Sequence, residues 1–515
     1  MTDTTTSDGL DVFDLCIVGG GINGAGIARD AAGQGLKVVL LERKDLGAET
    51  SSASSKLVHG GLRYLEYFEF GLVRKALKER DVLLSIAPHI IHPMRFVLPH
   101  DPSMRPVWMV RAGLWLYDHL GGKSVLPKSQ VVDLKTDARG AALRGDWGKG
   151  FAYSDCRVDD ARLVVLNAMA AREKGAVVLT QEGCDYLSPE KDKKLWRVRL
   201  DSGKQLKARM IVNASGPWVR QFLGENGLVN LRNTPSVRLV RGSHIVVPKL
   251  YDGDHAFIIQ NGDGRIVFAW PYYGFTAIGT TEVNMGTDPD HAAVIDAQEK
   301  AYLCQTASRI FNTDVTEQSV VSSWSGVRAL LEDGAKDAKS ATRDYKLYEN
   351  NLQDCPVLSV FGGKITTYRK LAEDAMAIIG KTLGFEPKSW TGGEALPGGD
   401  IEGGDMAAFV AQKWRQYSWL PQGLIMRYAL AYGTRMDVLL EGRGALRDLG
   451  RDLGHGLHVA ELDYLKKHEW AREADDVLWR RTKLGLVADP TMVHTVANYL
   501  NRPVTNQGTS EAPQP

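Results

Sequence analysis

The feature that most constrains the fold is a glycine pattern near the start of the chain, Gly19-x-Gly21-x-x-Gly24. It follows an apolar stretch and precedes a predicted helix over 27–33, and a second apolar stretch follows over 37–41. Glycine triplets occur by chance in long chains. The order of strand, glycine turn, helix and strand, however, is the context that a dinucleotide-binding βαβ unit requires. We therefore predict a dinucleotide site at this turn.

Each residue of the pattern has a distinct physical role. Gly19 permits a tight turn, Gly21 lets the backbone approach a pyrophosphate, and Gly24 lets helix and strand pack closely. The helix N-terminus offers N–H groups to the phosphates. Glu42 ends the second strand, where it can accept a hydrogen bond from a ribose hydroxyl, and an acid there disfavours the 2′-phosphate of NADP. The pattern does not separate NAD from FAD.

The next stretch of sequence distinguishes FAD from NAD, because it resembles a known family. Residues 50–66 read TSSASSKLVHGGLRYLE. Here the chain resembles the FAD-dependent glycerol-3-phosphate dehydrogenases of the aerobic, quinone-linked type, which belong to the D-amino-acid-oxidase-like flavoproteins. The resemblance runs from about Asp14 to Lys483, and one departure is Ala329, where the family usually has proline. It rests on further blocks, namely YSDCRVDDARLV, VNASGPWV, RGSHIVVP, IGTTE, SGVR, TRDY, SVFGGKITTYRKLAE and ADDVLWRRTKLG.

The predicted fold class is α/β, with a Rossmann-like FAD-binding domain, an antiparallel-sheet substrate domain and an all-helical C-terminal domain. β-branched and aromatic residues separated by Gly and Asp turns predict the antiparallel sheet over 236–285. Beyond 396–400 helical periodicity prevails. The predicted boundaries are an oxidoreductase region over 1–388, a helical domain over 389–503 and, from composition, a disordered tail over 504–515. Within 1–388 we expect FAD-binding parts at about 10–75, 155–235 and 355–388, and substrate-binding parts at about 80–150 and 236–350.

The resemblance implies which residues contact FAD. A run of small hydroxyl residues is suitable where backbone lies against a planar ring. Two glycines before a helix leave N–H groups that stabilise the negative charge of reduced flavin. A lysine beside them adds a full positive charge. The expected cofactor-binding residues are Gly19, Gly21, Gly24, Glu42, Ser51, Ser52, Lys56, Leu57, Gly216, Gly362, Gly363, Lys364 and Thr366.

The resemblance also implies oxidation of sn-glycerol 3-phosphate to dihydroxyacetone phosphate by hydride transfer to FAD. A phosphate dianion needs fixed cations, and the planar fork of arginine suits it best. We expect Arg328 first, then Arg63 and Arg343, as phosphate ligands, with Tyr64 orienting substrate oxygens.

The hydroxyl proton of the substrate needs a base, for which histidine is the natural residue at neutral pH. His59, beside a Gly-Gly bend, and His244, at the start of an apolar strand, are both candidates, and the sequence does not choose between them. Lys364 completes the expected catalytic residues. His89 and His92 share an H-x-x-H spacing, but prolines bracket them and no further ligand stands out, so we expect no metal.

Composition constrains location and partners. With 63 Lys and Arg against 62 Asp and Glu, the chain has no global field that would recruit nucleic acid. Its five scattered cysteines fit a reducing, cytoplasmic compartment, its polar start is unlike a secretory signal, and no apolar run reaches the length of a spanning helix. The resemblance implies membrane quinone as electron acceptor in glycerol catabolism and the respiratory chain. It also implies peripheral attachment to the cytoplasmic face of the inner membrane.

The segment 105–120 contains two tryptophans between basic flanks, and two interpretations of it stay open: an interfacial helix on lipid headgroups or a packed core helix. Alternatives for the whole chain are a soluble glycerol-3-phosphate oxidase that uses oxygen, an amine or amino-acid oxidase, and a non-catalytic flavin-binding scaffold. We expect a homodimer, with the helical domain either mediating dimerisation or covering the active site.

Overall fold

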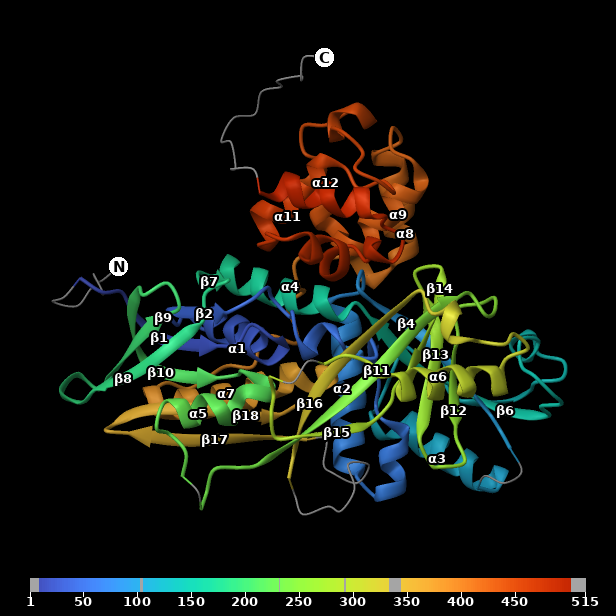
Figure 1. The fold of residues 1–515 in the computed structure, drawn as a ribbon, viewed down its shortest axis with the longest axis horizontal. Coiled ribbons are helices and arrows are strands. Elements are labelled where there is room, and N and C mark those ends of the chain that lie inside the picture. Colours follow the sequence, from blue (N-terminus) through green and yellow to red (C-terminus); the bar gives the residue numbers. More distant parts are fainter. Residues whose placement is uncertain (1–8, 102–104, 231, 291–292, 333–343, 502–515) are drawn as a thin grey trace.

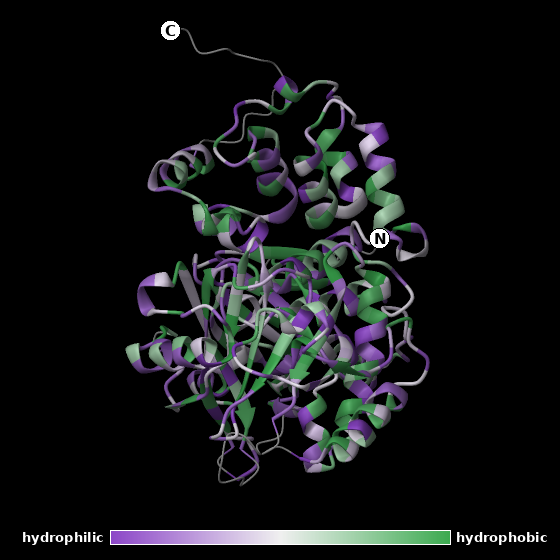
Figure 2. Ribbon diagram, turned by 90° about the vertical axis from the view of Figure 1, so that its right-hand side faces the viewer, coloured by the Kyte–Doolittle hydropathy of each residue, from purple (hydrophilic) through white to green (hydrophobic). Residues whose placement is uncertain are grey.

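The computed structural model describes residues 9–101, 105–230, 232–290, 293–332 and 344–501. Two sheets lie side by side, and the C-terminal helices form a separate layer over α4 (Asp160–Glu173) (Figure 1). Hydrophobic residues gather along the inner strands, while the outer helices and loops carry most of the hydrophilic ones (Figure 2). The predicted fold class is confirmed. The predicted tail over 504–515 lies outside the described residues.

The first sheet has a parallel centre with an antiparallel edge, in the order β17-β18-β10-β1-β2-β7. β1, β2, β7, β10 and β18 pair in parallel, β17 is antiparallel to β18, and the β8–β9 hairpin continues from β10. The strands are β1 (Val12–Val18), β2 (Val38–Glu42), β7 (Val177–Thr180), β8 (Cys184–Glu190), β9 (Leu195–Leu200), β10 (Gln205–Asn213), β17 (Tyr345–Leu352) and β18 (Cys355–Gly362).

Alternate residues of the central strands pack on opposite faces, as a sheet buried on both sides requires. Leu15 and Ile17 pack with α1 (Ile22–Gly33), α4 and α7 (Tyr368–Leu383). Cys16 and Val18 pack on the other face with β9 and α5 (Val219–Glu225). This double burial fixes the carboxyl end of β1, where the glycine turn begins.

The second sheet is built mostly from antiparallel strands, in the order β15-β11-β14-β13-β12-β4-β6-β3. β16 also pairs with β11, and β5 with β6, while β12 and β4 pair in parallel. The strands are β3 (Leu57–Val58), β4 (Ile91–Pro99), β5 (Gln130–Asp133), β6 (Lys149–Val158), β11 (Val237–Pro248), β12 (Ala256–Gln260), β13 (Ile266–Tyr272), β14 (Phe275–Gly279), β15 (Val283–Gly286) and β16 (Ser322–Leu331). α2 (Phe70–Ile86), α3 (Val107–Leu120) and α6 (Ala297–Ile310) pack around it.

The C-terminal domain has its own hydrophobic core, distinct from the cores of the two sheets. Its helices are α8 (Met406–Gln416), α9 (Gln422–Tyr432), α10 (Met436–Leu440), α11 (Val459–Glu469) and α12 (Pro490–Leu500), with a π-helical segment, Asp476–Arg481. α11 packs against α4.

The structure differs from the sequence predictions in several elements, among them the strands β4, β5 and β6, which were not predicted. α1 begins at Ile22 and not at residue 27, so Gly24 and Gly26 lie inside the helix. β16 and β17 were not predicted. The expected substrate part extends to 350, whereas β17 pairs with β18 in the first sheet. β17 is exposed along one side and lacks a continuous apolar run, which is why its sequence gives a weak strand signal.

Candidate active site

A cavity of about 630 Å³ opens between the two sheets, within the size range of small-molecule sites. Its lining comes from segments far apart in the sequence: the glycine turn after β1, the end of β2 with the following loops, the bend after β3, the turn after β10, the second half of β16, and the end of β18 with the turn that follows it. The carboxyl ends of β1, β2 and β10 therefore meet the second sheet at this point.

The glycine turn has the geometry of a cradle for a phosphate. Gly19 has a φ of +108°, and a Cβ there would lie 2.5 Å from the carbonyl oxygen of Ala214. At Gly24 a Cβ would lie 1.9 Å from the carbonyl oxygen of Gly19, so only glycine allows α1 to pack this closely on the turn. Glu42 accepts hydrogen bonds from the backbone N–H of Gly20 and of Lys44, each at 2.7 Å, and burial raises its pKa.

The donor set of this wall fits a dinucleotide. Asn23 lines the cavity, donates to the carbonyl of Gly362 and has no partner for its buried Oδ1 among the described residues. The buried Thr366 likewise has no partner for Oγ1 within that part of the chain. Buried polar atoms are almost always hydrogen-bonded, so the unpartnered Oδ1 of Asn23 in the cavity lining indicates a bound group. Sequence reasoning missed Asn23, which lies between two glycines of the pattern.

The structure divides the expected cofactor residues into two groups. Lining the cavity are Gly19, Gly21, Glu42, Ser51, Leu57, Gly216, Gly362, Gly363 and Lys364. Gly24, Ser52, Lys56 and Thr366 are not in the lining, which is defined on the described residues alone. Lys56 is buried against Asp160, and its Nζ donates to the carbonyl of Ser52 at 2.7 Å. Lys56 therefore holds the serine-rich loop from behind.

The two candidate histidines occupy different layers. His59 is half-buried, lines the cavity and lies edge-on to Phe268 at 6.1 Å. Burial and the nearby Lys364 hold the pKa of His59 well below its ordinary value. The imidazole is thus neutral at pH 7 and able to accept a proton.

His244 is fully buried behind the lining. It stacks on Trp324 at 4.9 Å, and its Nε2 lies 2.9 Å from Oγ of Ser55, which itself lines the cavity. A Cβ on Gly279 would overlap the ring, so His244 fills the space that this glycine leaves. The arrangement favours His59 as the group that reaches a substrate. His244 instead contacts Ser55 from behind the cavity wall.

Three expected substrate ligands, Arg63, Tyr64 and Arg328, line the cavity, and the fourth, Arg343, lies outside the described residues. Arg328 Nη2 donates to Oγ1 of Thr280 at 3.0 Å, and Nη1 lies 3.8 Å from a carboxylate oxygen of Glu282. Thr280 and Glu282 also line the cavity. Sequence reasoning missed both, although they belong to the IGTTE block.

The bend that carries His59 is held by a buried cluster. Tyr117 of α3 donates to Asp155 of β6 at 2.7 Å and accepts from the backbone N–H of Gly60 at 2.8 Å. Arg80 of α2 donates to the same carboxylate at 3.0 Å. α3 therefore connects directly with the residue next to His59, which no spacing in the sequence could reveal.

Comparison with known proteins gives two family matches. Residues 14–369 match the family described as FAD dependent oxidoreductase, and residues 389–505 match the C-terminal domain of alpha-glycerophosphate oxidase. The chain is 48% identical to a glycerol-3-phosphate dehydrogenase of Pseudomonas aeruginosa, over 95% of each chain. It is 48% identical to a D-erythritol 1-phosphate dehydrogenase of Brucella abortus, over 92% of this chain and 94% of that one.

A solved structure resembles the fold over nearly the whole chain. It is the glycerol-3-phosphate dehydrogenase of Bacillus halodurans complexed with FAD, which is 26% identical. The TM-score is 0.74, over 95% of this chain and 89% of that one.

Proposed function

Since this chain belongs to the family of FAD-dependent oxidoreductases, we propose that it oxidises sn-glycerol 3-phosphate to dihydroxyacetone phosphate and passes the electrons to a membrane quinone. The names of the Pseudomonas and Bacillus relatives support this substrate. The observation that carries the proposal is that one cavity is lined by two arginines, Arg63 and Arg328, together with the neutral His59.

The arginines suit the phosphate end of the substrate. Arg328 lies on β16, whose pairing with β11 over ten residues fixes its backbone, and Thr280 orients its guanidinium. Gly242 leaves room for it, because a Cβ there would lie 2.4 Å from Nη2. A guanidinium held in this way has a fixed orientation, and its planar fork suits a phosphate dianion. Arg63 adds a second cation to the lining.

His59 suits the reacting end. As a neutral imidazole close to the expected cofactor residues, His59 takes the proton of the substrate hydroxyl as the carbon is oxidised. FAD, when bound, supplies the hydride acceptor. Lys364 keeps positive charge close by, where its Nζ donates to the carbonyl of His59 at 3.2 Å and lies 5.5 Å from the ring of Tyr64.

α3 suits a lipid surface. One side of α3 is packed, with Leu114 and Tyr117 buried, but its other side exposes large apolar side chains, as does the neighbouring segment 67–70, which supports the interfacial interpretation of 105–120. We call this surface the α3 face; its residues are Tyr67, Phe68, Phe70, Trp108, Met109 and Trp115. Trp108 is 68% exposed and Trp115 is 63% exposed. Nearby bases, Arg105, Arg111 and Lys123, complement anionic headgroups.

None of the described helices combines the length and hydropathy that crossing a membrane requires. An apolar face with basic flanks binds from one side, so we propose peripheral attachment of the α3 face to the cytoplasmic face of the inner membrane. On the cavity side, Ile266 and Phe268 belong to the same hydrophobic cluster as Val107, Val110 and Leu114 of α3, so apolar side chains connect the cavity wall with this helix. The homodimer stays a prediction.

Anaerobic mixing tests the proposed reaction. The purified yellow protein is mixed with glycerol 3-phosphate in the absence of oxygen, and the flavin absorbance is followed. We expect rapid bleaching, and a flavin that keeps its colour at millimolar substrate would refute the proposal. D-Erythritol 1-phosphate is mixed in parallel because of the Brucella relative. Faster bleaching by that compound would assign the site to longer polyol phosphates.

The acceptor is tested on the bleached protein. A short-chain quinone analogue or air is then admitted, and the return of absorbance is timed. Fast return with the quinone and slow return with air support the quinone-linked enzyme. Fast return with air would favour the oxygen-using oxidase.

A further inference from the structure

The C-terminal block ADDVLWRRTKLG, residues 474–485, has no place in the reaction so far. Within the described part of the chain, no residue beyond Ile365 lines the cavity, so the C-terminal domain does not cover it. Yet this block buries its cations: the side chain of Arg481 is 0% exposed and that of Lys483 is 3% exposed. Burying a charge is costly unless it is paired, so their partners define what the block is for.

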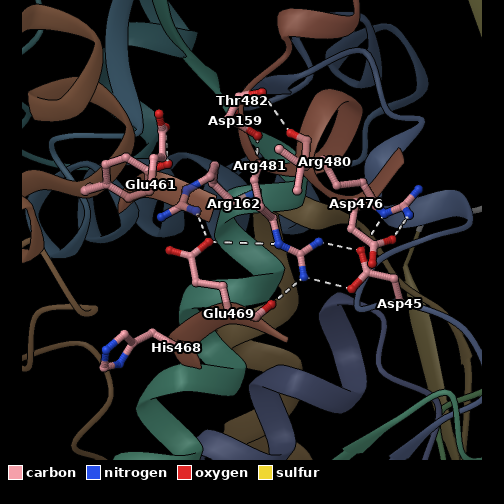
Figure 3. A network of polar contacts seen from close by, with 12 residues as sticks. Asp45, Asp159, Arg162, Glu461, His468, Glu469, Asp476, Arg480, Arg481 and Thr482 are labelled. Atoms are coloured by element: carbon pink, nitrogen blue, oxygen red, sulfur yellow. Dashed lines mark hydrogen bonds and ion pairs between the residues drawn. The ribbon is translucent and has the colours of Figure 1, made fainter. Parts of the chain in front are cut away.

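The first partner lies behind a cavity loop. Arg481 forms a two-pronged ion pair with Asp45, with Nη2 at 2.7 Å from Oδ1, and Arg480 Nε reaches the same carboxylate at 2.5 Å (Figure 3). Burial alone would raise the pKa of Asp45, but the two arginines hold it below its ordinary value. Asp45 is only 6% exposed and points away from the cavity, whereas its neighbours Arg43, Lys44 and Gly47 line it.

The second partner reaches the serine-rich loop. Lys483 Nζ donates to both carboxylate oxygens of Asp159, at 2.7 and 2.9 Å. The next residue, Asp160, is fully buried and accepts from Lys56 Nζ at 2.9 Å and from Ser54 Oγ at 2.7 Å. Asp159 and Asp160 lie at the start of α4. Lys483 of the C-terminal domain and Lys56 of the loop therefore bind to neighbouring carboxylates in the same helical turn.

α4 is fixed to the C-terminal domain at a third point. Arg162, 1% exposed, pairs with Glu469, which is fully buried at the end of α11 (Figure 3). Arg481 Nη2 also donates to the backbone carbonyl of Glu469 at 2.6 Å. The network thus joins the C-terminal domain, α4 and both cavity loops.

Hydrogen bonds fix the cavity side of the serine-rich loop, where Thr50 Oγ1 donates to the carbonyl of Val327 at 2.6 Å and Trp324 Nε1 donates to the carbonyl of Ser54 at 3.0 Å. Residues 43–49 and 50–56 contain small and polar side chains, with Leu46 the one large aliphatic residue among them. Small side chains bury little apolar area, so packing contributes little to fixing these loops. On the side away from the cavity lining, the buried ion pairs of Asp45 and Lys56 add charged contacts to each loop.

We propose that the block 474–485 is a positioning element of the cofactor site, in which Arg481 and Lys483 hold the two loops in the shape that binds FAD. The proposal goes beyond the substrate and the acceptor, and it rests on FAD binding alone. Arg481 and Lys483 act through Asp45 and through Asp159 and Asp160, without touching the cofactor.

The test compares FAD release from the holoenzyme and its variants. Lys483→Met and Arg481→Met keep much of the side-chain volume but remove the charge. FAD release after dilution is followed by flavin fluorescence, and visible-region circular dichroism reports how the ring is held. We expect release to be at least about tenfold faster, since each buried charged pair contributes more than a neutral hydrogen bond, together with an altered dichroic spectrum. Lys483→Arg, which restores a cation, should recover most of the loss.

The control is Arg447→Met, which removes an arginine of the same domain whose side chain is 90% exposed; its release rate should be unchanged. A purely structural role would lower the melting temperature but leave the release rate and the dichroic spectrum of the folded fraction unchanged, and that result would overturn the proposal. Should Arg481→Met fail to fold, Asp45→Asn breaks the same bridge at nearly constant volume. Unchanged FAD release in Asp45→Asn and in Lys483→Met would overturn it equally.

Discussion

Lys364 Nζ donates a hydrogen bond to the backbone carbonyl of His59 at 3.2 Å, across 305 positions of sequence. The contact joins the turn after β18 to the bend after β3, so one cation lies between two segments of the cavity wall. It also keeps positive charge beside the imidazole, which favours the neutral ring that a base requires.

His59→Asn should therefore slow substrate oxidation much more than His244→Asn. General base catalysis contributes about 10²- to 10⁴-fold, and only His59 lines the cavity. The measurement is the rate of anaerobic flavin bleaching at saturating glycerol 3-phosphate. His244→Asn serves as the matched control, and the reverse order of the two rates would assign the base to His244.

Arg328→Ala should raise the substrate concentration needed for half-maximal bleaching by about 10- to 100-fold. Hydrogen bonds to charged groups are worth about 1.5–3 kcal/mol, and this variant removes those to the phosphate. The FAD content should stay that of the parent. Arg199→Ala removes a half-exposed arginine that pairs with Asp185, and it should change neither quantity. Loss of FAD from Arg328→Ala would mean that the residue holds the cofactor.

Tyr117→Phe should slow bleaching and lower the free energy of unfolding by about 1–3 kcal/mol. The variant leaves Asp155 without one donor and the N–H of Gly60 without its shorter partner. Chemical denaturation and stopped-flow bleaching measure the two effects. Tyr186→Phe, at an exposed tyrosine, is the control. An unfolding change with no change in bleaching would show that the bend does not depend on this hydroxyl.

Replacing Trp108 and Trp115 together with serine should weaken binding to vesicles of anionic lipid at least about tenfold. A buried large apolar side chain contributes about 1.5–3 kcal/mol. Co-sedimentation measures the binding, and FAD content checks that the site is intact. Trp414→Ser removes a tryptophan of α8 that is 38% exposed, and it should bind like the parent. Equal binding by all three proteins would place the membrane contact elsewhere.

The free energy of unfolding should fall as the pH drops below about 6.5, the ordinary pKa of histidine. Burial, with nearby cations, holds the pKa values of His59, His89 and His244 well below that value. The unfolded chain therefore binds protons that the native chain does not, and the native state loses up to about 1.4 kcal/mol per pH unit for each histidine. Urea denaturation at a series of pH values measures the slope. A flat profile between pH 6.5 and 5 would contradict it.

The parts of the fold that local pattern determines were predictable. The glycine turn, its flanking strands and the helical C-terminal domain depend on residues close in sequence, whose spacing alone carries the signal. The lining by Arg63, Arg328 and Lys364 could be expected from the resemblance but not from the residues themselves.

The rest depends on contacts between distant residues. The sequence could not decide which of His59 and His244 faces the cavity. The difference is that Ser55 lies between the cavity and the ring of His244. The exposure of Trp108 and Trp115 depends on which side of α3 meets the second sheet. The pairing of Asp45 with Arg481 spans 436 positions, and any of several acids could have been the partner.

The order of synthesis gives that last pairing a consequence for the newly made protein. The ribosome synthesises the glycine turn and both loops first, and the segment 474–485 much later. A growing chain can thus complete its first sheet while Asp45 and Asp159 still lack their cations. On our proposal the site holds FAD firmly only after residues 474–485 have been made, so products truncated before that segment would lose their FAD.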